Sequence, residues 1–319
     1  MWRPAIHAGA SCMENFARAA GSPWKSRQNT KPSSHRRRNM SDMTTVGDFL
    51  RQAREQLRSH GIHEIEARWL VAAALQIAPI KLDLHLQQPL APQAARQLTE
   101  WIQRRCRHEP LQYILGTTFF MGLELRVGPG VLIPRPETEI LVEKALQAYP
   151  GRGEVLDLCT GSGCIPLAIA AQNRQIPAIT GTDISPEAIA WAKRNRRHLK
   201  LERVFFACGD LFEPVRGMRF SLITVNPPYI AESEKHLVSP EVHYEPPIAL
   251  WGGDHDGLGI VRRIVEELPA FLEPAGTFLC EVGWKQARQV ATLLQERGFT
   301  TIHIFTDQQG IERVIQASL

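Results

Sequence analysis

The chain has 319 residues, enough for one large and one small domain that each bury a core. The formal net charge is +4, but the first 39 residues hold eight Lys or Arg against Glu14, so they carry +7 and the remainder carries −3. That negative balance excludes a body that grips nucleic acid through an excess of positive charge. Six scattered cysteines, without metal-site spacing, indicate reduced thiols in an intracellular protein, and no apolar run is long enough to span a membrane.

Residues 1–40 form a basic leader that we expect to be disordered, because it is rich in Ser, Pro, Gly and Arg and shows no periodicity. Such a leader is typical of an organelle transit peptide. Met40 and Met43, however, stand just before the first periodic segment, and a start codon assigned too early would give the same pattern. We favour the misassigned start, which predicts a cytoplasmic protein. A transit peptide would instead predict an organelle matrix.

Residues 41–108 are predicted to form a small helical domain. Apolar residues recur at three- and four-residue spacing, and Thr44 or Thr45 is suited to cap the first helix. The expected helices lie at residues 46–57, 64–75 and 93–107. This domain is either a packing module or a domain that grips the substrate.

Residues 109–136 are predicted to link the two domains through a β-hairpin that turns at Gly122. The linker runs into the segment Ile-Pro-Arg-Pro-Glu-Thr-Glu at residues 133–139. Its prolines hold the chain extended, and its acidic residues favour the start of a helix. A stiff helix lead-in does not explain Arg135 between the two prolines.

From Glu154 the pattern alternates between strands and helices. Strands are expected at residues 155–158, 178–182, 204–207, 220–225, 277–282, 301–305 and 312–316. Helices are expected at residues 163–172, 186–196, 258–268 and 286–297. The last two strands are joined by a turn too short for a parallel crossover, so they pair antiparallel. We therefore predict an α/β domain at 137–319, with a mostly parallel, doubly wound sheet whose last strand is antiparallel.

A glycine-containing turn, Asp-Leu-Cys-Thr-Gly-Ser-Gly at residues 157–163, follows the first strand of this domain. Gly161 and Gly163 allow a ligand to approach the backbone closely, and the helix that follows offers free N–H groups. Asp183 ends the next strand, where a carboxylate can accept both hydroxyls of a ribose. Together these features predict a cofactor that contains a nucleoside.

The same pair of features would serve NAD, but a dinucleotide turn needs a third glycine where this chain has Pro166. S-adenosylmethionine (SAM) has no pyrophosphate, so the shorter turn is sufficient for it. Asp210, after the third strand, is a candidate for binding the adenine amino group. Equally, Gly209-Asp210 is a common loop dipeptide.

The segment Asn226-Pro227-Pro228-Tyr229 follows the apolar strand at 220–225. In an open α/β sheet, ligands bind at the carboxyl ends of the strands. Two consecutive prolines remove two N–H donors, so the loop offers a stiff row of carbonyl acceptors with an amide and a phenol at its ends. It suits a ligand that bears an NH2 group. The alternative is an ordinary turn after a strand.

These motifs resemble a known family. The glycine turn, Asp183 and the Asn-Pro-Pro-Tyr loop are similar to those of class I SAM-dependent methyltransferases that act on a planar amide or amine nitrogen. The segments at 133–139, 244–246 (Tyr-Glu-Pro) and 281–283 (Glu-Val-Gly) resemble, more narrowly, the peptide chain release factor N5-glutamine methyltransferases. The resemblance covers residues 44–319. It implies a Rossmann-like methyltransferase sheet of seven strands, a small N-terminal helical domain and a linking β-hairpin.

The resemblance also implies SAM as cofactor and the positions that bind it. These cofactor positions are Cys159, Thr160, Gly161, Ser162, Gly163, Asp183, Asp210, Leu211 and Asn226. Cys159 stands where the family commonly has Gly, and Leu211 stands where some members place an aromatic residue against the adenine. The substrate positions are Asn226, Pro227, Pro228 and Tyr229, and no metal is expected.

The implied reaction is methylation of the glutamine in the Gly-Gly-Gln motif of class 1 release factors. We expect the Asn226 oxygen and the Pro227 carbonyl to accept the two amide hydrogens of that glutamine and Tyr229 to cover the amide plane. The long loop at 230–257 and the helical domain are expected to hold the release factor. We expect a monomer with no nucleic-acid or membrane partner.

Three alternatives remain at this point. A DNA N6-adenine methyltransferase shares the Asn-Pro-Pro-Tyr motif, but it would need a basic recognition region that a body of charge −3 does not supply. A ribosomal-protein glutamine methyltransferase is a closer alternative, although the sequence Arg-Pro-Glu-Thr-Glu at residues 135–139 favours the release factor enzymes. A cofactor-binding adaptor without activity is disfavoured by the intact Asn226 loop.

Overall fold

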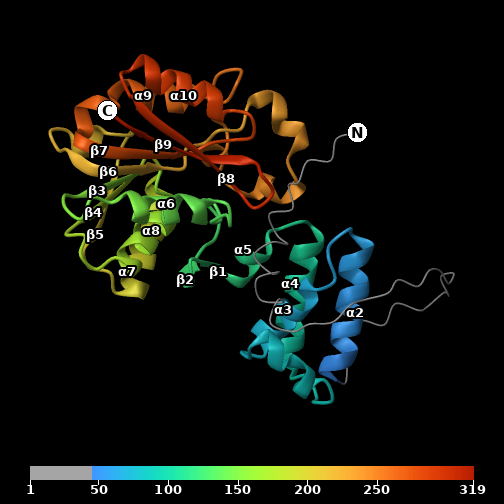
Figure 1. Cartoon of the computed structure of the whole chain (residues 1–319). Helices are drawn as coiled ribbons and strands as arrows, with labels where there is room; N and C mark the ends of the chain where they lie inside the picture. Colours follow the sequence, from blue (N-terminus) through green and yellow to red (C-terminus); the bar gives the residue numbers. More distant parts are fainter. Residues whose placement is uncertain (1–44) are drawn as a thin grey trace. The chain divides into compact units, whose positions relative to one another are not determined.

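The computed structural model describes residues 45–319, which form two units (Figure 1). One unit comprises residues 45–115 and the other residues 116–319. The predicted leader at 1–40 lies outside the described residues. Each unit has a hydrophobic core of its own, so each is described separately.

The first unit is helical, as predicted. Its elements are α2 (Val46–Ser59), α3 (Glu66–Ala74), the 3-10 helix η2 (Pro79–His85), α4 (Pro92–Cys106) and α5 (Leu111–Leu115). The Thr45 hydroxyl caps α2 by accepting a hydrogen bond from Asp48 N at 3.1 Å. The apolar faces of α2, α3 and α4 meet in one core, and a buried ion pair between Arg105 and Glu66 joins α4 to α3, with Nε and Oε2 2.5 Å apart. The short helices η2 and α5 were not predicted, because prolines made those stretches look like connections.

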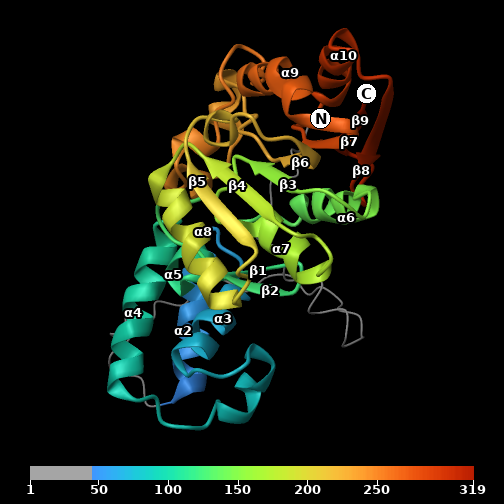
Figure 2. The same cartoon turned by 90° about the vertical axis from the view of Figure 1, so that its left-hand side faces the viewer.

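The second unit is built on a seven-stranded sheet in the order β5-β4-β3-β6-β7-β9-β8 (Figure 2). Its strands are β3 (Val155–Leu158), β4 (Ile179–Asp183), β5 (Val204–Cys208), β6 (Phe220–Val225), β7 (Leu272–Glu281), β8 (Thr301–Thr306) and β9 (Glu312–Ser318). β9 runs antiparallel to both of its neighbours, and the remaining pairs are parallel. The predicted sheet is therefore confirmed.

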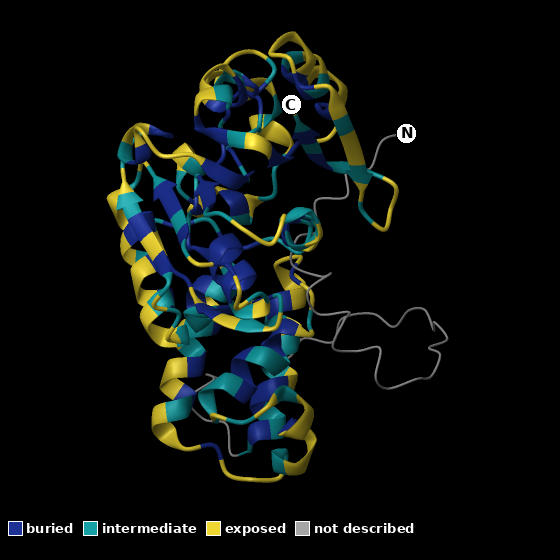
Figure 3. Ribbon diagram, turned by 60° about the vertical axis from the view of Figure 1, so that its left-hand side comes forward, coloured by how far each residue is buried: buried dark blue, intermediate teal, exposed yellow. Residues whose placement is uncertain are grey.

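Helices cover both faces of this sheet (Figures 1 and 3). They are α6 (Thr138–Ala148), α7 (Cys164–Gln172), α8 (Pro186–Leu199), α9 (Gly259–Phe271) and α10 (Ala287–Glu296). Successive residues of a strand point to opposite faces. Leu222 of β6 accordingly packs with α6, α7 and α8, whereas Ile223 packs with α9 and α10.

The predicted hairpin is formed by β1 (Thr117–Phe120) and β2 (Leu123–Arg126). It belongs to the second unit, where the buried side chain of Asn195 in α8 holds it. Asn195 Oδ1 accepts from Arg126 N at 2.7 Å, and Nδ2 donates to Arg126 O at 3.1 Å.

The long connection between β6 and α9 is more structured than its sequence indicated. It contains three 3-10 helices, η4 (Glu232–Leu237), η5 (Pro240–Tyr244) and η6 (Pro247–Ala249). Prolines start two of these short helices, and a proline at that position has no N–H to lose. Among all the helices of residues 45–319, none combines the length and the apolar character that crossing a bilayer requires.

Candidate active site

The predicted motifs meet at the point where the strand order of the sheet reverses. From β3 the chain runs outward through β4 and β5, and it then returns to place β6 on the other side of β3. Leu158 of β3 is aligned with Val225 of β6, so Cys159 and Asn226 leave the sheet side by side. Such a switch point leaves a crevice at the carboxyl ends of the strands, and one cavity opens there.

Most of the predicted site residues line this cavity. They are Cys159, Thr160, Gly161, Ser162, Asp183, Asp210, Leu211, Asn226 and Pro228. Gly163, Pro227 and Tyr229 do not line it. Apolar side chains that the motifs did not include complete the wall, among them Val131, Ile184, Ile248 and Ile260. Ile184 is 49% exposed, so it presents an apolar surface directly beside the Asp183 carboxylate.

Asp183 is held by two backbone N–H groups. Its Oδ2 accepts from Gly161 N at 2.8 Å, and its Oδ1 accepts from Ser185 N at 2.9 Å. Burial raises the pKa of Asp183, and these two hydrogen bonds oppose that shift. The carboxylate is therefore fixed at the edge of the cavity, and its remaining lone pairs are available to a ligand. Sequence reasoning assigned Asp183 to a ribose but did not foresee that it also fixes the glycine turn.

Cys159, in the glycine turn, and Leu211, in the loop after β5, adopt left-handed conformations. Cys159 has a φ of 53°, a conformation that favours glycine, since a side chain costs about 1 kcal/mol there. Leu211 has a φ of 46°, and its carbonyl accepts a hydrogen bond from Thr182 Oγ1 at 2.9 Å. Asp210, next to it, forms an ion pair of 2.5 Å with Arg263 of α9, which also lines the cavity.

Asn226 is oriented by a partner that the sequence did not reveal. Its Nδ2 donates to Thr138 Oγ1 at 3.1 Å, and Thr138 is buried at the start of α6. Because the NH2 group is used in this way, the Asn226 oxygen is left as the acceptor. This agrees with the expectation that Asn226 accepts a hydrogen from a substrate amide, which stays a prediction.

Tyr229 points its hydroxyl at a buried carboxylate instead of the cavity. The hydroxyl donates to Glu281 Oε1, at the end of β7, at 3.3 Å. Burial raises the pKa of Glu281 to about 7, while the Thr138 hydroxyl and Arg313 oppose that shift. Burial and the charge of Glu281 raise the pKa of Tyr229, so the phenol stays protonated. The expectation that Tyr229 covers the substrate amide remains a prediction.

Arg135, which the sequence left unexplained, forms an ion pair with Glu245. Glu245 is 3% exposed, and its second oxygen accepts from Ile133 N at 2.9 Å. One buried carboxylate thus ties the Pro-Arg-Pro segment to the long loop, and Arg135 itself lines the cavity.

The motifs missed Thr138, although it lies in a segment that was singled out. They also missed the role of Glu281 as the partner of Tyr229. The available signal was its position at the end of an apolar strand, because a glutamate is an unusual charge in a core. Within residues 45–319, no group of three or more His, Cys, Asp or Glu side chains is placed to hold a metal ion.

Two family models match the chain. The PrmC N-terminal domain matches residues 48–116, and the methyltransferase small domain matches residues 136–245.

Curated relatives match over nearly their whole length. The release factor glutamine methyltransferase of Geobacter sulfurreducens is 41% identical over 280 residues, which cover 86% of this chain and 96% of the relative. That of Pseudomonas aeruginosa is 39% identical over 273 residues, which cover 85% and 98%.

Among solved structures, the hMettl16 catalytic domain in complex with a 3′UTR hairpin is 16% identical, with a TM-score of 0.50 over 70% of this chain and 81% of that one. This likeness concerns the fold alone. The identity and coverage of the curated relatives carry the assignment: the chain belongs to the family of release factor glutamine methyltransferases.

Proposed function

We propose that this chain methylates the side-chain amide nitrogen, N5, of the glutamine in the Gly-Gly-Gln motif of class 1 release factors, with SAM as the methyl donor. Family membership supports the substrate class. The observation that carries the proposal is the orientation of Asn226, whose NH2 group is bound to Thr138 so that its oxygen is left to accept.

The cavity fits SAM in its donor set and its apolar wall. Asp183 is proposed to accept the ribose hydroxyls, and Ile184 and Leu211 to contact the adenine, with Asp210 near its amino group. The glycine turn provides room for close approach of the rest of the cofactor. When bound, SAM supplies an electrophilic methyl group on a sulfonium.

The protein's task is then to orient a weak nucleophile. An amide nitrogen shares its lone pair with the carbonyl, so it attacks only when it is held in place. The Asn226 oxygen and the Pro227 carbonyl are proposed to accept both hydrogens of the substrate NH2 group, which fixes the nitrogen and favours the positive charge it gains. The leaving group is a neutral thioether, and the proton leaves after transfer, so no general base is required.

The helical unit and the 230–257 loop are proposed to hold the release factor, and the protein is proposed to act as a monomer in the cytoplasm. A DNA adenine methyltransferase remains the rival that shares the Asn-Pro-Pro-Tyr motif. The relatives named above support the protein substrate over DNA.

The test is mass spectrometry of a release factor after incubation with the enzyme and SAM. We expect one added methyl group, on the glutamine of Gly-Gly-Gln. Asn226→Ala is expected to bind SAM but to lose this methylation. Methylation of duplex DNA or of a ribosomal protein, with an unmodified release factor, would overturn the proposal.

A further inference from the structure

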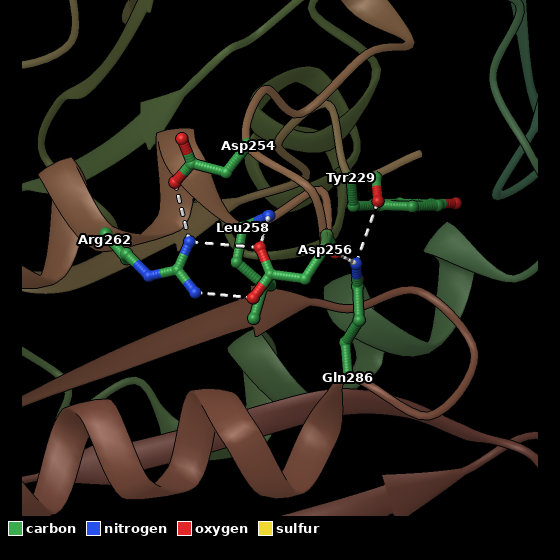
Figure 4. Close-up of polar contacts among 6 residues, drawn as sticks. All are labelled: Tyr229, Asp254, Asp256, Leu258, Arg262 and Gln286. Atoms are coloured by element: carbon green, nitrogen blue, oxygen red, sulfur yellow. Dashed lines mark hydrogen bonds and ion pairs between the residues drawn. The ribbon is translucent and has the colours of Figure 1, made fainter. Parts of the chain in front are cut away.

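The two ends of the loop at residues 230–257 meet at one buried side chain, that of Gln286 (Figure 4). Gln286 directly precedes α10 and is 8% exposed. Its Nε2 donates to the carbonyl oxygens of Tyr229, at 2.9 Å, and Asp256, at 2.8 Å. Tyr229 ends the Asn-Pro-Pro-Tyr segment, and Asp256 lies at the far end of the loop. A single carboxamide therefore bridges the two.

The orientation of the Gln286 carboxamide is itself fixed. Its Oε1 accepts a hydrogen bond from Gly283 N at 2.8 Å, so both N–H donors and the oxygen have partners. Gly283 has no space for a side chain, because a Cβ there would lie 2.6 Å from Gln286 Oε1 and 3.0 Å from Tyr229 Cδ2. The chain from Gly283 to Gln286 therefore packs closely against the side chain of Tyr229.

The far end of the loop has a second anchor in α9. Arg262 donates to Asp256 Oδ2 at 2.5 Å and Oδ1 at 3.0 Å, and it also donates to Asp254 at 2.7 Å (Figure 4). This guanidinium lowers the pKa of Asp256, so the carboxylate stays ionised. Gly257 completes the junction, since a Cβ there would lie 2.3 Å from Tyr229 O. The backbones at both loop ends are in direct contact.

We propose that Gln286 is a positioning residue for methyl transfer, which holds the Asn-Pro-Pro-Tyr segment and the far end of the long loop in one fixed relation. The inference rests on the proposed function. Tyr229 is two residues from Pro227, so a displaced Tyr229 backbone also displaces the carbonyl that is to accept a substrate hydrogen. Gln286 does not line the cofactor cavity, so its loss leaves the cofactor contacts intact.

The test compares Gln286→Glu, which keeps the shape and loses both N–H donors, with Gln286→Met, which keeps the length and loses all three hydrogen bonds. Gln289, exposed on α10, provides the matched controls Gln289→Glu and Gln289→Met. With the full chain, SAM and a release factor, we expect kcat to fall about 10- to 100-fold in both Gln286 variants, because a small misplacement of reacting groups costs that much. The Kd of SAM is expected to match that of the wild type.

Hydrogen exchange gives a readout that does not depend on turnover. The amides of Ile230 and Gly252 bond Leu250 O and Ile230 O at the base of the loop. We expect them to exchange faster in the Gln286 variants, with unchanged exchange in β3 and β4. Wild-type kcat in both variants, or faster exchange throughout the unit, would overturn the positioning role. A wild-type enzyme that leaves the release factor unmodified would instead overturn the proposed function. The exchange of the Ile230 amide would still decide whether Gln286 holds Tyr229 and Asp256 together.

Discussion

Replacing Thr138 with valine tests whether the orientation of Asn226 matters for the reaction. Valine has nearly the shape of threonine but no hydroxyl, so the Asn226 NH2 group loses the acceptor that it now reaches at 3.1 Å. Thr138 is 1% exposed, and water does not replace the lost partner easily. The Asn226 amide is then free to turn over and present N–H groups where an oxygen is needed.

The size of the effect follows from the hydrogen bond that is lost. An unsatisfied polar group at a buried site costs about 1 to 3 kcal/mol. If that cost falls on the transition state, kcat drops about 5- to 150-fold. Thr138→Ser is the matched control, because it keeps the hydroxyl and removes only a methyl group. We expect it to retain most of the activity.

The assay is the initial rate of methyl transfer from labelled SAM to a release factor at saturating concentrations of both. Thermal unfolding and the Kd of SAM are measured in parallel, since Thr138 also lines the cavity. If Thr138→Val folds, binds SAM and turns over at the wild-type rate, the reasoning about Asn226 is refuted.

Three further predictions concern the carboxylates Glu281, Glu245 and Asp183. The pKa of Glu281 is raised to about 7 in the folded state, so its contribution to stability is fully present below the pKa of the unfolded chain and is lost as the pH rises through about 7. Glu281→Gln should therefore flatten the fall in unfolding free energy between about pH 4.5 and pH 7, measured by urea titration. The exposed control Glu296→Gln should reproduce the wild-type curve, and an unaltered curve for Glu281→Gln would contradict the prediction. Glu245→Gln removes the buried counter-charge of the half-buried Arg135 and should lower the unfolding free energy by about 3 kcal/mol. Glu232→Gln, in an exposed ion pair, should not change it measurably, and equal urea midpoints for the two variants would argue against the Arg135–Glu245 pair. Asp183→Asn places an NH2 group against one of two backbone N–H donors and should weaken SAM binding about 10-fold or more by calorimetry; an unchanged Kd would remove Asp183 from the cofactor site.

The parts of the fold that the sequence predicts are those with local causes. The strand at 155–158, the glycine turn and the helix after it are encoded in one short stretch, and the structure has them at those positions. The antiparallel pairing of β8 and β9 follows from the length of a single turn. The glycine turn, Asp183 and the Asn-Pro-Pro-Tyr segment each follow a parallel strand. Their meeting in one crevice can therefore be predicted without any knowledge of side-chain contacts.

The parts that the sequence does not predict depend on contacts between distant residues. Asn226 and Thr138 are separated by 88 positions, and Arg135 and Glu245 by 110. No periodicity or motif relates such pairs, because their meeting depends on where the sheet places α6 and the long loop. The same reason explains why the role of Arg135 was left open.

The position of β9 within the sheet has a consequence for how the protein is made. β9 lies between β7 and β8, so β8 reaches the rest of the sheet only through a strand that is synthesised after it. Until residues 312–318 leave the ribosome, the edge of β7 from Thr277 to Glu281 is unpaired. The nascent enzyme is therefore expected to stay inactive, and dependent on protection of that edge, until residues 312–318 have been translated.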